Sequence, residues 1–439
     1  MRQSSTSIFG IELGGQGSSI VRESKVDWFA MILVLLMLGL GWLNLYSISK
    51  TDGNGLLDLT THHGRQGLFI LFSLAMGGFI LYLDTKFLEF VSYIAYGGSL
   101  LLLAAVFTVT AVKGAASWFE FGGFKFQPTE FAKVATIMAM SKFMSRYNFS
   151  LRNNADLLTG IAIGVVPMLM VLLQNDAGSA LVFLGLIFVF YREGLHPFVL
   201  IGGALVGLNG VLSVMFSDHS DFKFYLMGFF ILLGILSFIF VFRMRFIVLH
   251  IIAIALMCGL PLVAGSVLKP HQSARLRVLA ASDDKINSDA ELNKTYYNLR
   301  HSMVAIGSGG VLGKGFGKST HTRGDFVPEE QTDYIFCVVS EEHGFVGSSL
   351  VIIMLFLLLW RLIYMAERAK SKYALVLGYG AASLIFMHVF INVGMTIGLL
   401  PTVGIPLPFF SYGGSSTISF VMMIFIMQNH YSYRTNLLS

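Results

Sequence analysis

The sequence predicts an all-α, polytopic transmembrane bundle of ten to twelve spans, with one large extracytoplasmic loop and one reentrant loop. Composition is the first reason: 55% of the 439 residues are hydrophobic, 13% are charged, and the mean hydropathy is +0.72. A soluble domain carries about 25% charged residues, because water must wet its surface. Apolar runs near the roughly 20 residues that cross a bilayer are the second reason. We therefore expect lipid around most of the chain.

The apolar runs give the expected spans in order. Several are short, and the run 333–364 is long enough to be kinked or tilted across a bilayer of about 30 Å. The runs are 28–48, 66–83, 88–110, 130–146, 158–173, 178–192, 197–216, 223–242, 246–267, 333–364, 373–397 and 415–430.

Basic residues in the loops predict the orientation of the chain. If the N-terminus is cytoplasmic, the short inner segments are richer in Lys and Arg than the short outer ones, as the positive-inside rule requires once the long loop 268–332 is left out of the count. We expect cytoplasmic tails at 1–27 and 432–439, helices over 28–267, and further helices over 333–431.

Two segments on the predicted outer side break the pattern of spans. Residues 268–332 are polar, charged and glycine-rich, and a loop of that length is uncommon and usually functional. Residues 398–414 are apolar but contain three prolines. Non-helical backbone at membrane depth survives only where protein or a watery cavity satisfies it. We expect 398–414 to be a reentrant loop that lines a cavity, although an ordinary surface loop is the alternative.

Charge and cysteine content argue against two other kinds of protein. The net charge of +5 is small and spread between apolar runs, whereas a nucleic-acid binder gathers basic residues on one surface. Cys258 and Cys337 both lie in apolar context, so we interpret them as buried thiols. The chain shows no Cys/His cluster of the kind that binds zinc.

Ionisable residues in or beside spans cost about 2.5–3.5 kcal/mol each on insertion scales, so each needs an explanation. Glu130 and Lys133 are three residues apart at the start of a span, share a helix face and can pair. They form either a structural ion pair or a charged wall of a substrate cavity. Asp176 precedes a short apolar run, where capping of the next helix is favoured over direct catalysis. Adjacent Glu341 and Glu342 point in different directions on a helix and make no ready acid/base pair.

The large loop holds the richest chemistry. It carries Arg275 and Arg277, an acidic cluster over 283–291, and the glycine-rich stretch 305–317 that includes Lys314. The spacing is not that of a nucleotide-binding P-loop. Backbone amides freed by glycines can still hold an anion such as pyrophosphate, and arginines can do so with two hydrogen bonds. Most of the acidic cluster is a solvated surface, and only one carboxylate need act.

Taken together, these stretches resemble the SEDS family (shape, elongation, division, sporulation), and within it the RodA branch more than the FtsW branch. The resemblance runs from the first span to the last, and the combination of motifs is highly specific. The matching stretches are Trp118 with FKFQPTEFAK, then QNDAGSA, RLRV, AIGSGGVLGKG, FVPEEQTDYIF with SEEHGFVG, and LLPTVGIPLPFFSYGGSS.

The resemblance implies a multi-pass protein of the inner (cytoplasmic) membrane that polymerises lipid II into glycan strands for cell elongation and shape. It also implies a class B penicillin-binding protein as partner, and a divalent cation, Mg²⁺ or Mn²⁺, is expected. Family members usually have ten spans, so the two extra apolar runs indicate an inserted hairpin near 197–242.

The resemblance also carries residues over by motif. The family's essential aspartate lies about eleven residues before the serine that corresponds to Ser302, a position that falls on Glu291. Because the loop is a few residues longer than usual, we favour Asp289, with Glu291 next and Asp284 third. Substrate or pyrophosphate contacts are expected from Trp118, Glu130, Lys133, Arg275, Arg277, Ser302 and Lys314. Cavity or structural roles are expected for Asp176, Glu329, Thr332, Asp333, Ser411 and Gly413.

The implied reaction joins an anomeric carbon to a sugar hydroxyl and releases pyrophosphate. A carboxylate base activates the hydroxyl, typically worth 10²–10⁴ in rate, and cations neutralise the leaving group. Two alternatives remain: a flippase that moves lipid II across the bilayer, and a scaffold that only recruits the partner. The enzyme predicts charged groups gathered on the outer side, whereas a flippase predicts a path open alternately to both sides.

Overall fold

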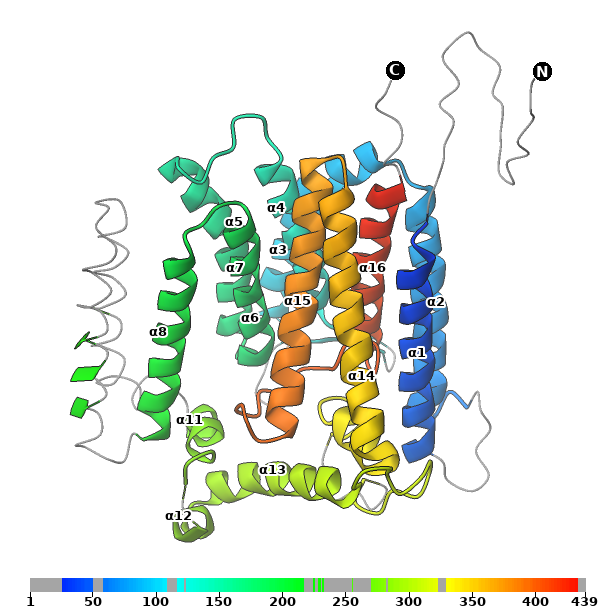
Figure 1. Cartoon of the computed structure of the whole chain (residues 1–439), viewed down its shortest axis with the longest axis vertical. Helices are drawn as coiled ribbons and strands as arrows, with labels where there is room; N and C mark the ends of the chain where they lie inside the picture. The colour runs from blue at the N-terminus through cyan, green and yellow to red at the C-terminus, as the bar shows by residue number, and fades with distance from the viewer. Residues whose placement is uncertain are drawn as a thin grey trace.

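A computed structural model describes residues 26–49, 58–108, 117–121, 124–216, 270–281, 283–322 and 329–432, with a few single residues between 224 and 255. Long helices run side by side in a bundle (Figure 1). The helices that run along the bundle are α1 (Trp28–Ser49), α2 (His62–Tyr82), α3 (Thr85–Val106), α4 (Pro128–Met144), α5 (Asn154–Leu173), α6 (Ala177–Phe183) with α7 (Ile187–Arg192), α8 (Pro197–Met215), α14 (Ile335–Arg368), α15 (Lys372–Thr396) and α16 (Gly414–Ser432).

Helices occupy every expected span that lies within the described residues, and their bounds follow local sequence signals. By length and composition, α1, α2, α3, α5, α8, α14 and α15 could each cross a membrane. Asn153 caps α5 and Ser371 caps α15, each side chain accepting a hydrogen bond from a backbone N–H in the first turn. The runs 223–242 and 246–267, and with them the second half of the inserted hairpin, fall almost entirely outside the described residues.

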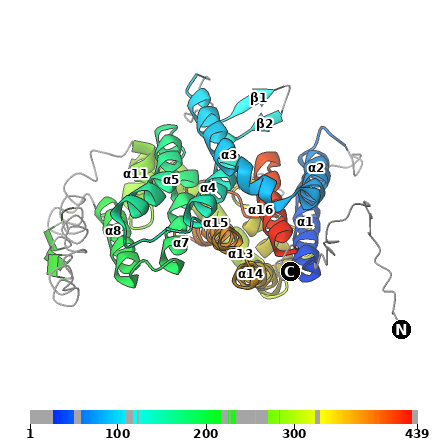
Figure 2. The same cartoon turned by 90° about the horizontal axis from the view of Figure 1, so that it is seen from above.

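The centre of the bundle is formed by α15 and α16. α15 packs on α14 and α4, and α16 packs on α2 (Figure 2). A 3-10 turn, Leu184–Leu186, joins α6 to α7 where this short span meets α15. Gly185 lies in that turn, and a Cβ there would come within 2.9 Å of the Ser383 carbonyl oxygen. The two segments therefore touch backbone to backbone. Large apolar side chains such as Leu71 (66% exposed) face outward, as a lipid-facing surface requires.

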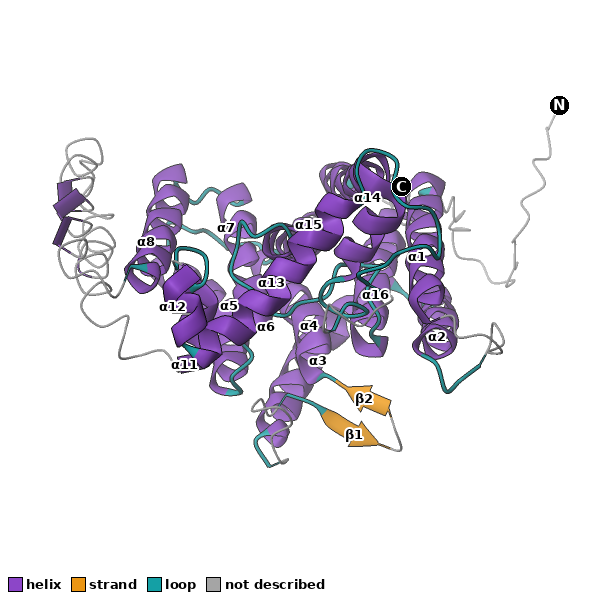
Figure 3. Ribbon diagram, turned by 90° about the horizontal axis from the view of Figure 1, so that it is seen from below, coloured by secondary structure: helices purple, strands orange, loops and turns teal. Residues whose placement is uncertain are grey.

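The large loop is not a simple polar loop, because it contains three helices that the sequence reasoning missed. α11 (Pro270–Arg277) and α12 (Asp283–Ser288) precede α13 (Ala290–Ser308), which lies across one end of the bundle (Figures 1 and 3). Ala274, Val278, Leu292 and Leu299 form a small core that packs α11 on α13. The start of α1 and the end of α16 lie at the opposite end of the bundle, as expected if the loop and the two tails are on different sides.

α14 is kinked, as its length predicted. Gly344 has non-helical backbone angles, φ 65° and ψ −161°. The glycine-rich stretch after α13 docks at this kink, because the amides of Phe345 and Val346 donate to the carbonyls of Gly310 (2.9 Å) and Val311 (3.1 Å). The backbone groups that the kink frees from helical bonding are thereby satisfied, as burial requires.

The all-α prediction holds apart from one hairpin. β1 (Phe119–Phe121) and β2 (Phe124–Phe126) pair antiparallel just before α4. Trp118, an expected substrate contact, is half-buried directly before β1.

Replacing Gly313 by alanine should lower the stability of the protein by more than about 2 kcal/mol. Gly313 has φ +80°, and a Cβ there would lie 2.1 Å from the Glu342 carbonyl oxygen. A left-handed conformation alone costs about 1–2 kcal/mol in a residue with a side chain. The measurement is thermal unfolding in detergent. Gly307→Ala is the matched control, because nothing lies within 4 Å of a Cβ at this helical position. Equal losses in both variants would contradict the docking of this stretch on α14.

Candidate functional site

The segment between α15 and α16 runs through the protein without helical structure, as predicted for 398–414. Residues 405–411 are mostly buried, so their backbone groups need protein partners. Asn392 donates to the Ile405 carbonyl (2.7 Å), and His388 lies 3.1 Å from the Pro406 carbonyl. Ser411 accepts from the Leu407 amide (2.8 Å), and Gly413 donates to Gln66 (3.1 Å). We call residues 401–413 the buried segment; Gly404 is its one exposed residue.

Glu130 and Lys133 form an ion pair in the protein interior, with 2.8 Å between Lys133 Nζ and Glu130 Oε1. Both side chains are at most 1% exposed. Ser419 donates to the other oxygen of Glu130 (2.9 Å), and His388 Nε2 lies 2.6 Å from Lys133 Nζ. Because this pair is fully enclosed, Lys133 contacts protein groups here and not the predicted substrate.

His388 connects this ion pair to the buried segment. The Pro406 carbonyl can only accept, so Nδ1 of the imidazole carries the proton and donates to it. Nε2 is then the acceptor for the Lys133 ammonium. The sequence reasoning missed both His388 and Ser419. An ionisable side chain within a span is itself a functional signal, and that signal could have singled out His388.

Asp176 caps α6, which confirms the predicted capping role of this residue. Its Oδ1 accepts from the Ser179 amide (3.0 Å), and its Oδ2 accepts from Gln127 (3.1 Å). The start of α6 touches the buried segment, because a Cβ on Gly178 would lie 2.6 Å from the Val403 carbonyl oxygen. The helix that Asp176 caps therefore packs against the predicted cavity wall.

Arg275 and Asp333 contact the buried segment near its start, at Val403 and Gly404. Arg275, on α11, donates to the Val403 carbonyl at 3.4 Å. Asp333 precedes α14, and its Oδ2 would lie 2.9 Å from a Cβ on Gly404. Burial, reinforced by the Glu329 carboxylate, raises the pKa of Asp333 to about 7. Arg275 and Asp176 also contribute to the electrostatic environment of Asp333.

The three candidate bases lie on or beside α12 and the start of α13. Asp289 caps α13, with Oδ1 accepting from the amides of Glu291 (3.0 Å) and Leu292 (3.3 Å). Its Oδ2 lies 3.3 Å from Arg277. Glu291 is exposed in the first turn of α13. The backbone of Asp284 is in α12, and its side chain is outside the described residues.

The glycine-rich stretch does not form the predicted anion cradle. The amides of Lys314 and Gly315 donate to the carbonyls of Glu341 (3.0 Å) and Glu342 (2.9 Å), and Gly317 donates to the Glu342 carboxylate (3.1 Å). These N–H groups are engaged by α14, so that prediction is wrong for them.

The side chain of Lys314 also contacts α14, since its Nζ lies 2.6 Å from Glu341 Oε1. Glu341 further accepts from the amides of Thr320 (2.8 Å), His321 (3.0 Å) and Thr322 (3.0 Å). Glu342 accepts from Ser319 and Ser47. The two adjacent carboxylates point in different directions, and each binds a different part of the loop to α14.

The remaining expected site residues have structural contacts. Ser302 on α13 donates to the Thr396 carbonyl (2.7 Å) and contacts Cys337, a buried free thiol. Glu329 has φ 58°, and its carbonyl accepts from the Thr332 amide (3.1 Å). These contacts fix α13 and the turn before α14 against the bundle.

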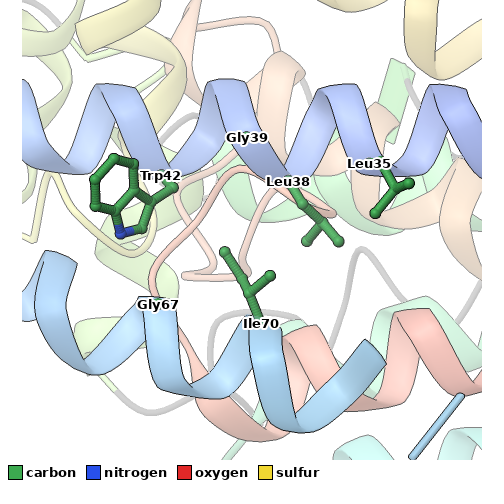
Figure 4. Close-up of a pocket in the computed structure, with 6 residues that line it drawn as sticks. All are labelled: Leu35, Leu38, Gly39, Trp42, Gly67 and Ile70. Carbon is green, nitrogen blue, oxygen red and sulfur yellow. The ribbon is translucent and has the colours of Figure 1, made fainter. Parts of the chain in front are cut away.

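An apolar groove opens between α1 and α2 (Figure 4). Its volume is about 280 Å³. Leu36 and Leu71, each next in sequence to a lining residue, are largely exposed. The lining residues are Leu35, Leu38, Gly39, Trp42, Gly67 and Ile70.

Comparison with known proteins identifies the family of the chain. Residues 27–230 and 225–436 match the family described as cell cycle proteins, FtsW/RodA/SpoVE. The chain belongs to this family. The resemblance inferred from the motifs is therefore confirmed, and with it the fold class of a multi-pass helical membrane protein.

Named relatives of this FtsW/RodA/SpoVE member agree with the family assignment. The chain is 32% identical over 341 residues, 76% of each chain, to the peptidoglycan glycosyltransferase MrdB of Escherichia coli K12. A solved structure described as a peptidoglycan synthase complex that coordinates polymerization and crosslinking matches with a TM-score of 0.67 and 24% identity. It covers 94% of this chain and 99% of its own. The crystal structure of RodA from Thermus thermophilus matches with a TM-score of 0.59, the same identity and the same coverage.

Replacing His388 by leucine should destabilise the protein, because the Lys133 ammonium and the Pro406 carbonyl both lose a partner. A buried unpaired group costs about 1–3 kcal/mol, and more when charged. His388→Gln should recover most of the loss, since its amide can accept from Lys133 and donate to Pro406. Thermal unfolding of both variants in detergent measures this. Equal stability of the leucine and glutamine variants would show that the two hydrogen bonds contribute nothing.

Proposed function

We propose that this chain is a peptidoglycan glycosyltransferase that polymerises lipid II at the extracytoplasmic face of the inner membrane, for cell elongation and shape. The observation that carries the proposal is the position of α11 and α13. Arg275 on α11 reaches the Val403 carbonyl (3.4 Å), and Arg277 reaches Asp289 at the start of α13 (3.3 Å). One short basic helix thus bridges the buried segment and the candidate bases, at a polar end of a lipid-embedded body.

The acceptor hydroxyl needs a base within hydrogen-bond reach. Asp289 is an engaged carboxylate, because it caps α13 and pairs with Arg277. Glu291 is exposed in the first turn of the same helix, with no side-chain hydrogen bond among the described residues. The contacts therefore favour Glu291 as the base and Asp289 as the residue that holds the helix start and Arg277. Asp284 stays the third candidate.

The pyrophosphate leaving group needs positive charge beside it. Arg275 and Arg277 are partly exposed on α11 and supply it. The Lys133 ammonium is enclosed by protein, so its part in the site is to hold Glu130 and His388 in place. Lys314 is held by Glu341 and anchors the loop.

A divalent cation stays a prediction. The described residues contain no group of three or more His, Cys, Asp or Glu side chains placed to hold a metal. Mg²⁺ is often bound by one or two carboxylates together with substrate phosphates. One carboxylate of the acidic cluster over 283–291, together with the pyrophosphate itself, would be such a set, and the cation would then supply charge neutralisation when bound.

The proposal also includes a lipid carrier and a partner protein. A polyprenyl tail needs an apolar path between helices, and the groove between α1 and α2 offers one within the described residues. With both tails cytoplasmic, α11–α13 face outward, where a class B penicillin-binding protein can crosslink the new strand. The synthase complex with a similar fold supports such a pairing.

Glu291→Gln should lower polymerisation of lipid II by about 10²–10⁴, the usual contribution of a general base. Asp289→Asn should also reduce activity, but it should in addition lower the melting temperature, because a cap and an ion pair are weakened. The assay uses purified protein, alone or with its partner, with lipid II and Mg²⁺ or Mn²⁺ in detergent. If both variants polymerise at the wild-type rate, the base is elsewhere.

The same assay separates enzyme from flippase. Glycan strands formed in detergent, without a bilayer to cross, require a polymerase. Wild-type protein that forms no strands with its partner and either cation present would contradict the proposed function.

A further inference from the structure

Asp333 is fixed in place from both sides. Its backbone amide donates to the Glu329 carbonyl (3.0 Å), and its carbonyl accepts from Asn392 on α15 (2.8 Å). Asn392 also donates to the Ile405 carbonyl (2.7 Å), so the backbone of Asp333 is held beside the buried segment. Gly404, with φ +72°, leaves room for it, since a Cβ there would lie 2.9 Å from Asp333 Oδ2.

Three separate parts of the chain bring charge to this point. Arg275 comes from α11 and bonds the Val403 carbonyl, next to Gly404. Asp176 comes from the start of α6, whose Gly178 also contacts Val403. Glu329 comes from the turn before α14, and with Thr332, Arg275 and Asp176 it is one of the groups that act on Asp333. Arg275 and Asp333 thus contact Val403 and Gly404 directly, while Glu329 and Asp176 act on Asp333 through their charge.

We propose that Asp333 is a second proton-transfer group of the reaction, the one that donates a proton to the departing pyrophosphate. This inference rests on the proposed function. The α13 carboxylate takes the proton from the attacking hydroxyl while the bond from that oxygen to the anomeric carbon forms. The bond from the anomeric carbon to the pyrophosphate oxygen breaks, and that oxygen receives the proton of Asp333. Water then reprotonates Asp333 and removes the proton from the base, so no net proton is consumed.

The surroundings of Asp333 suit this role. An ionised carboxylate would repel pyrophosphate, whereas a neutral carboxyl can donate a hydrogen bond to it. Burial raises the pKa of Asp333 to about 7, so a large fraction of the protein carries the proton near neutral pH. Arg275 adds the fixed positive charge that brings an anion to the same place.

The pH dependence has a definite direction. The acid must be protonated, so kcat should fall as pH rises through about 7, the raised pKa of Asp333. The base must be ionised, so kcat should also fall at low pH, and the profile should be bell-shaped. In Asp333→Asn the fall at high pH should disappear, and kcat at pH 6 should drop about 10²-fold, the lower limit for a lost acid.

Glu329→Gln gives a second, independent test. Removal of a nearby negative charge lowers the pKa of a carboxyl, so the high-pH fall of this variant should move to lower pH. Both variants are measured from pH 5 to pH 9 with lipid II, in the complex with the partner if the partner is needed. Thermal unfolding shows whether each variant is folded.

The outcomes are distinguishable. If wild type polymerises lipid II but Asp333→Asn keeps the high-pH fall and stays within twofold in kcat, this inference is wrong and the proposed function stands. If Asp333→Asn unfolds, an unshifted profile in Glu329→Gln overturns the inference. If wild type does not polymerise lipid II at all, the proposed function itself has failed.

Discussion

The rest of the structure depends on the burial of a non-helical backbone inside a helical bundle. Three prolines keep residues 401–413 from forming a helix, yet residues 405–411 of this connection between α15 and α16 are mostly buried. Each buried amide and carbonyl must find a partner. His388, Asn392, Gln66 and Arg275 provide such partners from three helices. The contacts that satisfy the buried backbone of the segment therefore also fix the candidate functional side chains in place.

This constraint explains why the charged side chains gather where they do. A polar side chain that bonds the segment lies close to it, and the groups that bond that side chain in turn lie nearby. Lys133 is held through His388, and Asp333 is positioned through Asn392. The outer helix α13 is tied to the same region by Ser302, which bonds the end of α15. Stability and the candidate chemistry thus share one network.

The sequence predicted those features that depend on short-range pattern. Apolar runs located the helices within a few residues, the aspartate before a short run indicated a cap, and the excess length of α14 indicated its kink. The proline-rich stretch was recognised as non-helical because proline removes donors locally.

Features that depend on distant partners could not be predicted. Lys314 is 27 residues from Glu341 in sequence, and His388 is 255 residues from Lys133. Nothing local indicates such pairings. The helices within 268–332 were missed because their apolar positions, such as Leu292 and Leu299, are few and lie among charged residues. That face is sufficient only because α11 covers it.

The contact at Gly185 carries a consequence well away from any charged group. Because the backbone there touches α15 at Ser383, the size of a single hydrogen atom sets how closely the two helices approach. His388 lies five residues beyond Ser383 on α15, so a displacement of α15 at this contact would carry the imidazole with it. A glycine far from any charge thereby bears on the position of the histidine that contacts Lys133.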